Sequence, residues 1–240
     1  MHTQADLKTA CFIDFDHTIF DTDAFYHVEL RKKLGLFEVP DELWEEIYWD
    51  TIKGGWPWER HLLTVINRSA ALRDLECCKE RTKLAYIRST FVEMEKELPK
   101  FVFPDVIPFL EKTQAVSRLF ILTRGQLEWQ KYKIDGCGLK EYFERVLIAD
   151  KRDGKADIIQ WFVKNRSCRA VFIDNNPYDL DLVKGAFPAV ETYMINRVPD
   201  ELMTPEDRIG RLRFLEAREI AKRPSKHEHI KRGSLDEIKI

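Results

Sequence analysis

The residues best suited to chemistry lie at the ends of short apolar runs. Asp14, Asp16 and Thr18 come at and just after the end of ACFIDFD, the first such run. One residue separates Asp14 from Asp16, so on an extended chain their carboxylates point to opposite sides and cannot both be core residues. Aspartate is also disfavoured inside a strand. The spacing therefore predicts a polar site where this run ends.

Polar groups follow the later runs as well. Thr123–Gly125 offers a hydroxyl and backbone amides at the opening of a helix, which is an anion site. Lys155 stands near the start of the next helix, and Asp174 and Asp179 share the turn after the fourth run. Mg²⁺ prefers one or two carboxylates together with phosphate oxygens and water. The combined set predicts Mg²⁺ facing a phosphate.

These groups are placed by an alternation of strand and helix. Buried strands are predicted at 10–16, 118–124, 145–150 and 169–175, with a weaker one at 190–196, because each run is short and apolar on both alternating sets. Helical patterns lie between them, at 105–115, 125–135, 153–165 and 177–186. This order is typical of a doubly wound parallel α/β sheet, in which ligands bind outside the carboxyl ends of the strands.

The alternation is interrupted once, after the first strand. Helical patterns at 24–34, 41–52, 58–72 and 84–98 predict an all-helical insertion with no strand. We expect an α/β core domain at 1–21 and 105–200, a helical cap at 22–104, and a C-terminal helix with a basic tail at 201–240.

The C-terminal segment is basic. Residues 208–232 hold nine Lys and Arg and three Asp and Glu. Residues 204–207 predict a helix start with a capping Thr204, and Ile209, Leu212, Leu215 and Ile220 form its apolar stripe. A solvated basic face is expected, with a partner- or nucleic-acid-binding role as the alternative. The stretch 224–240 is expected to be a polar tail.

Composition narrows the class of protein. The 240 residues are 44% hydrophobic with a formal net charge of -2, and the five cysteines contain no CxxC pair. This balance favours a soluble cytoplasmic protein without membrane or nucleic-acid binding. The oligomeric state is left open.

The order and spacing of the four motifs FIDFDHT, ILTRG, Lys155 and FIDNNPYD resemble the haloacid dehalogenase (HAD) superfamily, in its phosphatase branch with a helical cap inserted after the first motif. The resemblance covers about residues 9–196. It implies that Asp14 is a nucleophile that forms an aspartyl-phosphate, and that Asp16 protonates the leaving oxygen and then deprotonates water. Thr123 and Lys155 would hold the phosphoryl oxygens. Thr18, Arg124 and Gly125 are further candidates for phosphate binding.

The resemblance also implies a metal site. Mg²⁺ would sit on Asp14, the backbone carbonyl of Asp16, and Asp174, with Asp179 in support. The fourth motif departs from some relatives by carrying Asn175 where they have a second adjacent Asp, which bears on the completeness of this metal shell.

Two further departures concern single residues. His17 stands where many relatives carry glycine, and it either narrows the entrance or packs structurally. Arg124 follows Thr123, and its side chain either contacts substrate or forms an outward ion pair.

Other residues have structural alternatives. Asp16 and Thr18 could cap the turn, and Asp179 could cap the helix after Pro177. Lys151 is a rival for the role of Lys155. Asp21 and Asp23 are expected to be solvent-exposed or capping.

An aromatic cluster marks the insertion. Its members are expected first of all to form the core of the insertion, and they are Trp44, Tyr48, Trp49, Trp56 and Trp58. The glycine pair in the segment GGWPW at 54–58 instead predicts a loop that presents Trp56 and Trp58 to the substrate.

Together these features predict a Mg²⁺-dependent phosphatase acting on a small-molecule phosphate monoester. The alternatives are a phosphomutase or phosphotransferase of the same superfamily, or a non-catalytic phosphate-binding regulatory module. A carbon–halogen hydrolase is disfavoured, because it has no leaving oxygen and Asp16 would have no task.

Overall fold

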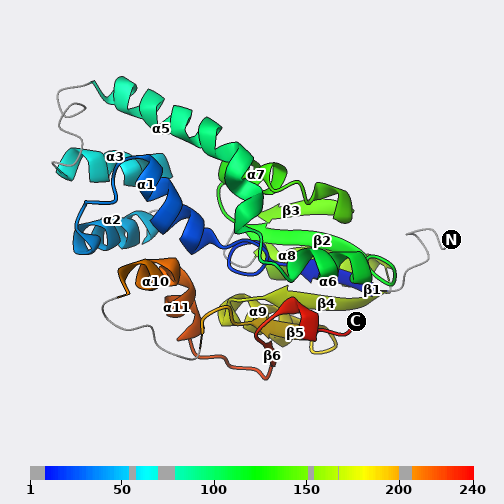
Figure 1. The fold of residues 1–240 in the computed structure, drawn as a ribbon. Helices are drawn as coiled ribbons and strands as arrows, with labels where there is room; N and C mark the ends of the chain where they lie inside the picture. Colours follow the sequence, from blue (N-terminus) through cyan, green and yellow to red (C-terminus); the bar gives the residue numbers. More distant parts are fainter. Residues whose placement is uncertain (1–8, 54–57, 70–78, 151–153, 167, 200–206) are drawn as a thin grey trace.

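The computed structural model describes residues 9–53, 58–69, 79–150, 154–166, 168–199 and 207–240. Its centre is a six-stranded sheet with the order β3-β2-β1-β4-β5-β6 (Figure 1). All neighbouring strands are parallel. The strands are β1 (Thr9–Ile13), β2 (Arg118–Arg124), β3 (Arg145–Ala149), β4 (Arg169–Asp174), β5 (Glu191–Ile195) and β6 (Ile230–Arg232). The strand order reverses between β1 and β4, the point at which such sheets bind ligands.

Helices cover both faces of the sheet. They are α6 (Val106–Thr113), α7 (Leu127–Gly136), α8 (Gly154–Arg166) and α9 (Pro177–Ala186), with a 3-10 turn η5 (Lys140–Tyr142). Successive residues of β1 enter different cores: Cys11 and Ile13 lie in one apolar cluster, and Phe12 lies in the other. Phe12 stacks on Phe120 of β2 at 5.1 Å between ring centroids. Burial on both faces, and with it the predicted α/β fold class, is confirmed.

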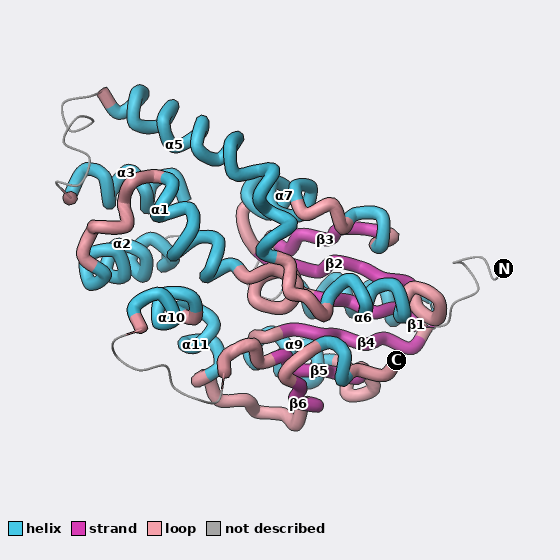
Figure 2. The backbone as a smooth tube through the Cα atoms, in the orientation of Figure 1, coloured by secondary structure: helices cyan, strands magenta, loops and turns pink. Residues whose placement is uncertain are grey.

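The insertion between β1 and α6 contains helices and no strand among its described residues. They are η2 (Ala24–Leu30, a π-helix), α1 (Arg31–Lys33), α2 (Asp41–Lys53), α3 (Trp58–Arg68), α5 (Glu80–Met94) and η4 (Glu95–Phe101, a 3-10 helix). They gather at one side of the sheet (Figure 2). The chain leaves and returns side by side, since the Asp21 amide donates to the Phe101 carbonyl at 2.7 Å. Trp44 and Tyr48 are buried, as expected of a core.

The C-terminal segment differs from the expectation. Residues 204–206 lie outside the described part, and the helix begins at Arg208 with Asp207 as its cap, accepting from the Gly210 amide at 2.8 Å. Phe214 divides the segment into α10 (Arg208–Arg213) and α11 (Leu215–Ala221). The predicted apolar stripe is therefore wrong at Ile209, which is 48% exposed.

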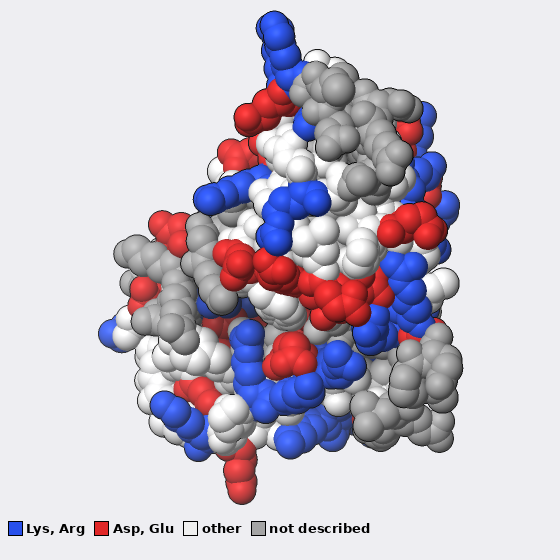
Figure 3. All heavy atoms as spheres, turned by 90° about the vertical axis from the view of Figure 1, so that its left-hand side faces the viewer, with Lys and Arg blue, Asp and Glu red and all other residues white. Residues whose placement is uncertain are grey.

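Three arginines of this segment pair with acids of the insertion and of the turn before it. Arg208 and Arg211 form ion pairs with Asp41 of α2, and Arg213 pairs with Asp21. Figure 3 looks onto the side where α2 and α10 lie and shows Lys and Arg beside Asp and Glu instead of an unbroken basic patch. The expected solvated basic face thus holds for Arg213, whose side chain is 55% exposed, whereas Arg208 and Arg211 are half-buried against Asp41.

The polar tail expected at 224–240 is also wrong. Residues 230–232 form β6, which extends the sheet beside β5, and the 3-10 turn η6 (Leu235–Glu237) follows. Leu235 and Ile238 are buried. The strand β6 has the sequence IKR, which shows no apolar pattern because a strand at the edge of the sheet is little buried. The sequence therefore did not predict β6. None of the described helices combines the length and apolar character required to cross a membrane.

Candidate active site

The carboxyl ends of β1 and β4 bring the predicted acids and lysine together. The Asp14 amide donates to the Ile173 carbonyl at 2.8 Å, which ties the two strand ends to each other. Lys155 Nζ lies 2.6 Å from Asp14 Oδ1 and 2.8 Å from Asp174 Oδ2, and it is 3.5 Å from Asp179 Oδ2. All four side chains are buried. Lys151, the rival lysine, lies outside the described residues.

This cluster holds more negative than positive charge. Burial raises the pKa of Asp14, and the neighbouring carboxylates add to that rise against the attraction of Lys155. Burial and the charge of Asp14 likewise hold the pKa of Asp174 well above its usual range. Burial lowers the pKa of Lys155, but the three carboxylates outweigh burial and raise it. Because one ammonium faces three buried carboxylates, the donor set fits a hard divalent cation.

Two buried hydroxyls border the cluster. Thr18 Oγ1 and Thr123 Oγ1 have no hydrogen-bond partner within the described part of the chain. Buried polar atoms are normally satisfied, so unsatisfied hydroxyls at a site are available to an oxygen-rich ligand. Both threonines were predicted to bind phosphate, and their free hydroxyls fit that role.

Gly125 is required by the turn after β2. Its φ of +150° is one that other residues rarely adopt, and an added Cβ would lie 2.7 Å from Gln130 Nε2. Arg124, the last residue of β2, pairs through Nη1 with Asp179 Oδ1 at 3.2 Å. Asp179 also accepts from Asn176 Nδ2 at 3.2 Å. Asn176 itself caps α9 by accepting from the Tyr178 amide, so the predicted capping role of Asp179 is wrong.

Asp16 is held by three residues. Thr22 Oγ1 donates to Asp16 Oδ1 at 2.5 Å, and Gln130 Nε2 donates to Oδ2 at 2.7 Å. Lys133 forms an ion pair with Oδ1. Burial raises the pKa of Asp16, but the charge of Lys133 and these hydrogen bonds outweigh burial and lower the pKa to about 2.

Gln130 and Lys133 lie on α7 and were not identified from the sequence. Lys133 is fully buried, with Nζ 5.2 Å from the ring centroid of Trp129, 5.6 Å from that of Phe15 and 5.8 Å from that of Phe20. Helical spacing contained a signal, because Gln130 and Lys133 fall on the same face as the buried Trp129. Lysine is almost never fully buried without a partner, so a lysine on the buried face of a helix indicates an ion pair.

His17 packs into the structure. Nε2 lies 3.3 Å from Glu216 Oε2, and Nδ1 lies 3.9 Å from Asp23 Oδ2. Burial lowers the pKa of His17, but Asp23 and Glu216 outweigh burial and raise it to about 10. Asp21 and Asp23 are buried, so neither is solvent-exposed, but the capping alternative is confirmed for both. Asp21 Oδ1 accepts from the Ala24 amide at 3.0 Å at the start of η2, and Asp23 Oδ2 accepts from the Glu216 and Ala217 amides at 3.0 Å at the start of α11.

His17, Asp23 and Glu216 form a separate group of potential metal ligands, whose donor atoms all lie within 4.8 Å of one another. The imidazole lies between the carboxylates and uses both of its nitrogens on them. The three residues thus already form a charge-paired network.

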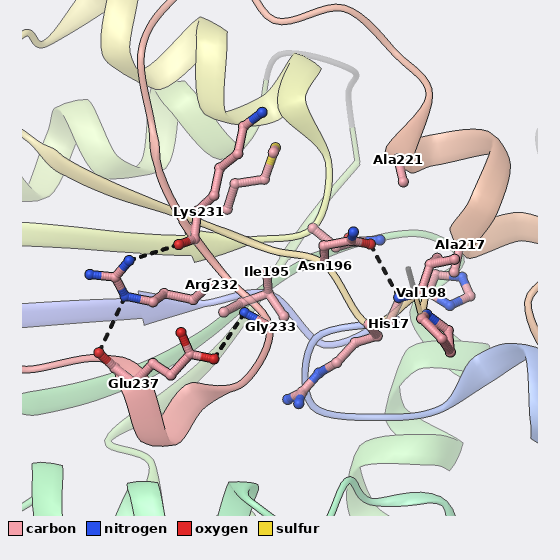
Figure 4. Close-up of a pocket in the computed structure, with 14 residues that line it drawn as sticks. His17, Ile195, Asn196, Val198, Ala217, Ala221, Lys231, Arg232, Gly233 and Glu237 are labelled. Atoms are coloured by element: carbon pink, nitrogen blue, oxygen red, sulfur yellow. Dashed lines mark hydrogen bonds between the residues drawn. The ribbon is translucent and has the colours of Figure 1, made fainter. Parts of the chain in front are cut away.

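A cavity of about 540 Å³ lies at the carboxyl ends of β5 and β6. Its lining includes His17, in the turn after β1, and Asn175, which directly follows β4. In Figure 4, His17 lies at one end beside Ala217 of α11, and Arg232 and Glu237 lie at the other. Asp14, Lys155 and Asp174 are not among the residues that line this cavity.

The two tryptophans predicted to face the substrate have different outcomes. Trp56 lies outside the described residues. Trp58 is the first residue of α3 and packs on Phe91 and Trp129, at 4.3 and 5.7 Å between ring centroids. It joins the insertion to α7 of the core.

No family model and no curated protein matches the sequence. Solved structures do match. A haloacid dehalogenase-like hydrolase from Burkholderia xenovorans LB400 is 19% identical with a TM-score of 0.67, over 98% of this chain and 100% of that chain. The chain has the haloacid dehalogenase fold. The resemblance seen in the four motifs is confirmed at this level, and a parallel sheet with an inserted helical region fits it.

Other proteins with the HAD fold carry different descriptions. L-2-haloacid dehalogenase from Xanthobacter autotrophicus, with chloropropionic acid covalently bound, is 15% identical with a TM-score of 0.61, over 95% of each chain. The HAD-hydrolase YfnB from Bacillus subtilis, bound to magnesium, is 15% identical with a TM-score of 0.55, over 83% of this chain and 91% of that chain.

Proposed function

We propose that the protein is a Mg²⁺-dependent hydrolase of a small-molecule phosphate monoester. The observation that carries this proposal is the position of Lys155 between Asp14 and Asp174, with a second carboxylate, Asp16, on the turn that follows Asp14. The unpartnered hydroxyls of Thr18 and Thr123 support a phosphate as the ligand.

Asp14 is assigned the nucleophilic role. One of its carboxylate oxygens attacks phosphorus in line, an O–P bond forms, and the P–O bond of the ester breaks. The leaving oxygen takes a proton from Asp16. Water then attacks phosphorus and gives a proton to Asp16, and inorganic phosphate leaves Asp14.

To donate a proton, Asp16 must first exchange the hydrogen bonds and ion pair that keep it ionised. A carboxylate with a pKa of about 2 carries almost no proton near neutral pH. Lys133, Gln130 and Thr22 therefore hold Asp16 in a resting state. Contact with an anionic substrate favours the protonated form of Asp16, because a nearby like charge raises a carboxyl pKa.

Asp14, Asp174 and the backbone carbonyl of Asp16 would hold the Mg²⁺, with Asp179 in support. When bound, Mg²⁺ supplies positive charge that stabilises the phosphoryl oxygens. Lys155, which now contacts both Asp14 and Asp174, would then share these carboxylates with the cation and contact the phosphate.

We also propose that the predicted domain division applies. Residues 1–21 and 105–200 would form the core and 22–104 the cap. The C-terminal part at 201–240 would be a third unit, and its described residues contact both of the others, since α10 pairs with α2 and β6 joins the sheet.

A carbon–halogen hydrolase is the second candidate. Solved structures of L-2-haloacid dehalogenases share this fold, and a halide leaves without a proton, so an ionised Asp16 held by Lys133 would not hinder the reaction. In that reaction Asp14 attacks carbon and halide departs.

One paired assay separates the candidates. The purified protein is incubated with a panel of phosphorylated metabolites and Mg²⁺, scored by phosphate release, and with 2-haloacids in EDTA, scored by halide release. Phosphate release that EDTA abolishes supports the phosphatase. Halide release in EDTA, without phosphate release, would replace it with the second candidate.

A further inference from the structure

His17 holds an uncommon backbone conformation directly after Asp16. Its φ of 59° lies in the left-handed region, and no other non-glycine residue among those described has a positive φ. Such a conformation is strained for a residue with a side chain and persists only when surrounding contacts hold it. The side-chain partners of His17 therefore help to hold the turn that carries Asp16, together with main-chain hydrogen bonds such as the one from the His17 amide to the Phe20 carbonyl at 2.8 Å.

The principal partner is a residue of the C-terminal helix α11. Glu216 Oε2 lies 3.3 Å from His17 Nε2, although 199 positions separate them. Both side chains are largely enclosed, with 5% of His17 and 24% of Glu216 exposed. An ion pair screened from water restrains geometry more strongly than an exposed one.

Glu216 is itself fixed from two directions. The Tyr48 hydroxyl of α2 donates to Glu216 Oε2 at 2.6 Å. The Glu216 and Ala217 amides donate to Asp23 Oδ2 at 3.0 Å each, which seats the start of α11 on the segment after the turn. The carboxylate that meets His17 is thereby held in place.

We propose that Glu216 is a positioning residue that holds the catalytic turn, through its ion pair with His17, in the conformation that presents Asp16. This inference depends on the proposed function only in assigning Asp16 to the reaction. The contribution of Glu216 to holding the turn is argued from the contacts of His17 and does not depend on which reaction the site catalyses. Through this contact, helix α11 near the end of the chain would help to position the site residues near its beginning.

The test compares Glu216→Gln in two backgrounds. Glutamine keeps the shape and can accept from Tyr48, but it loses the charge that attracts His17. In the natural background, we expect hydrogen–deuterium exchange in residues 15–23 to rise about tenfold or more. We expect kcat to fall between about 10- and 100-fold with less than a twofold change in KM, because misplaced groups lose catalysis more than binding.

The second background is His17→Gly. Glycine adopts a positive φ without strain, so the turn no longer needs the ion pair. Adding Glu216→Gln there should change exchange and kcat by less than about twofold. His17→Asn serves the same purpose if the glycine variant is unstable, since asparagine tolerates the left-handed region.

Glu219→Gln, on the same helix and paired with Lys222 at 2.7 Å, is the matched control and should change neither quantity. Exchange is measured without substrate or Mg²⁺, so its result stands whether or not the phosphatase proposal does. Unchanged exchange in Glu216→Gln, or equal losses in both backgrounds, would overturn the positioning role.

Discussion

The ammonium group of Lys133 is paired with the carboxylate of Asp16 and is fully buried beneath aromatic rings. Each charge depends on the other, since an unpaired buried charge is strongly destabilising. The pair connects a helix that follows the second strand to the turn that follows the first. It therefore links folding stability to a residue of the candidate site.

Replacing Lys133 by Met should lower the free energy of unfolding by an amount that depends on pH. The folded pKa of Asp16, about 2, lies below its unfolded value of about 3.9. The pair thus stabilises the fold fully above about pH 4, and this contribution disappears as pH falls through 2. We expect Lys133→Met to cost about 2–3 kcal/mol at pH 7 and far less at pH 2, as measured by urea unfolding.

Lys131→Met is the control for that experiment. Lys131 lies on the same helix but is exposed, so its loss should be close to neutral at every pH. A deficit of Lys133→Met that stayed constant from pH 7 to pH 2 would show that the ion pair is not its origin.

The two carboxylates of the first motif should respond differently to conversion to amides. Asp14→Asn removes the nucleophile, so we expect neither turnover nor covalent phosphate labelling. Asp16→Asn should slow alkyl phosphates by about 10²–10⁴-fold, because proton transfer contributes on that scale. An activated aryl phosphate should lose less in its first step, and labelled protein should then accumulate.

Phosphate release and labelling, measured for both variants on both esters, test this assignment. Activity retained by Asp14→Asn, together with complete loss in Asp16→Asn on every ester, would mean that the two roles are wrongly assigned.

The strands that deliver Asp14, Thr123 and Asp174 were predictable because each is an apolar run of ordinary strand length, bounded by polar turns. Side chains that act through long-range pairing were not. Lys133 and Glu216 lie 117 and 199 positions from their partners Asp16 and His17, and no local pattern encodes such a contact. β6 was missed because an edge strand of three residues lacks the apolar pattern of the buried strands.

Asp41 should be essential for attaching the C-terminal segment to the insertion. It accepts from Arg31 at 2.9 Å, Arg208 at 2.7 Å and Arg211 at 2.5 Å, and Arg31 is fully buried. Asp41→Asn leaves that buried guanidinium without a counter-charge, which typically costs about 3–5 kcal/mol. For a chain of this size we expect a fall in Tm of about 10 °C at pH 7.

The pH dependence gives a second measurement on the same variant. Burial raises the pKa of Asp41, but hydrogen bonds from Arg208 and Arg31 outweigh burial and lower it to about 2. The stabilisation is present above about pH 4 and is lost towards pH 2, so the Tm difference should shrink over that range. Glu46 lies on α2 like Asp41 and forms an exposed ion pair with Arg68 of α3. As a control, Glu46→Gln should shift Tm by less than about 3 °C.

A substitution of Trp58 tests whether its ring selects substrate or only packs against neighbouring aromatic rings. Its contacts run from Phe91 to Trp129, and Trp129 covers Lys133, which pairs with Asp16. Removing a large packed ring typically costs about 3–5 kcal/mol, and we expect Trp58→Ala to lower Tm by about 6–15 °C. Because packing affects every substrate alike, the relative rates on a panel of esters should stay within about twofold of the natural ranking. Trp58→Phe, which keeps an aromatic contact with Trp129, should recover most of the stability. A changed ranking with an unchanged Tm would instead place the ring against the substrate.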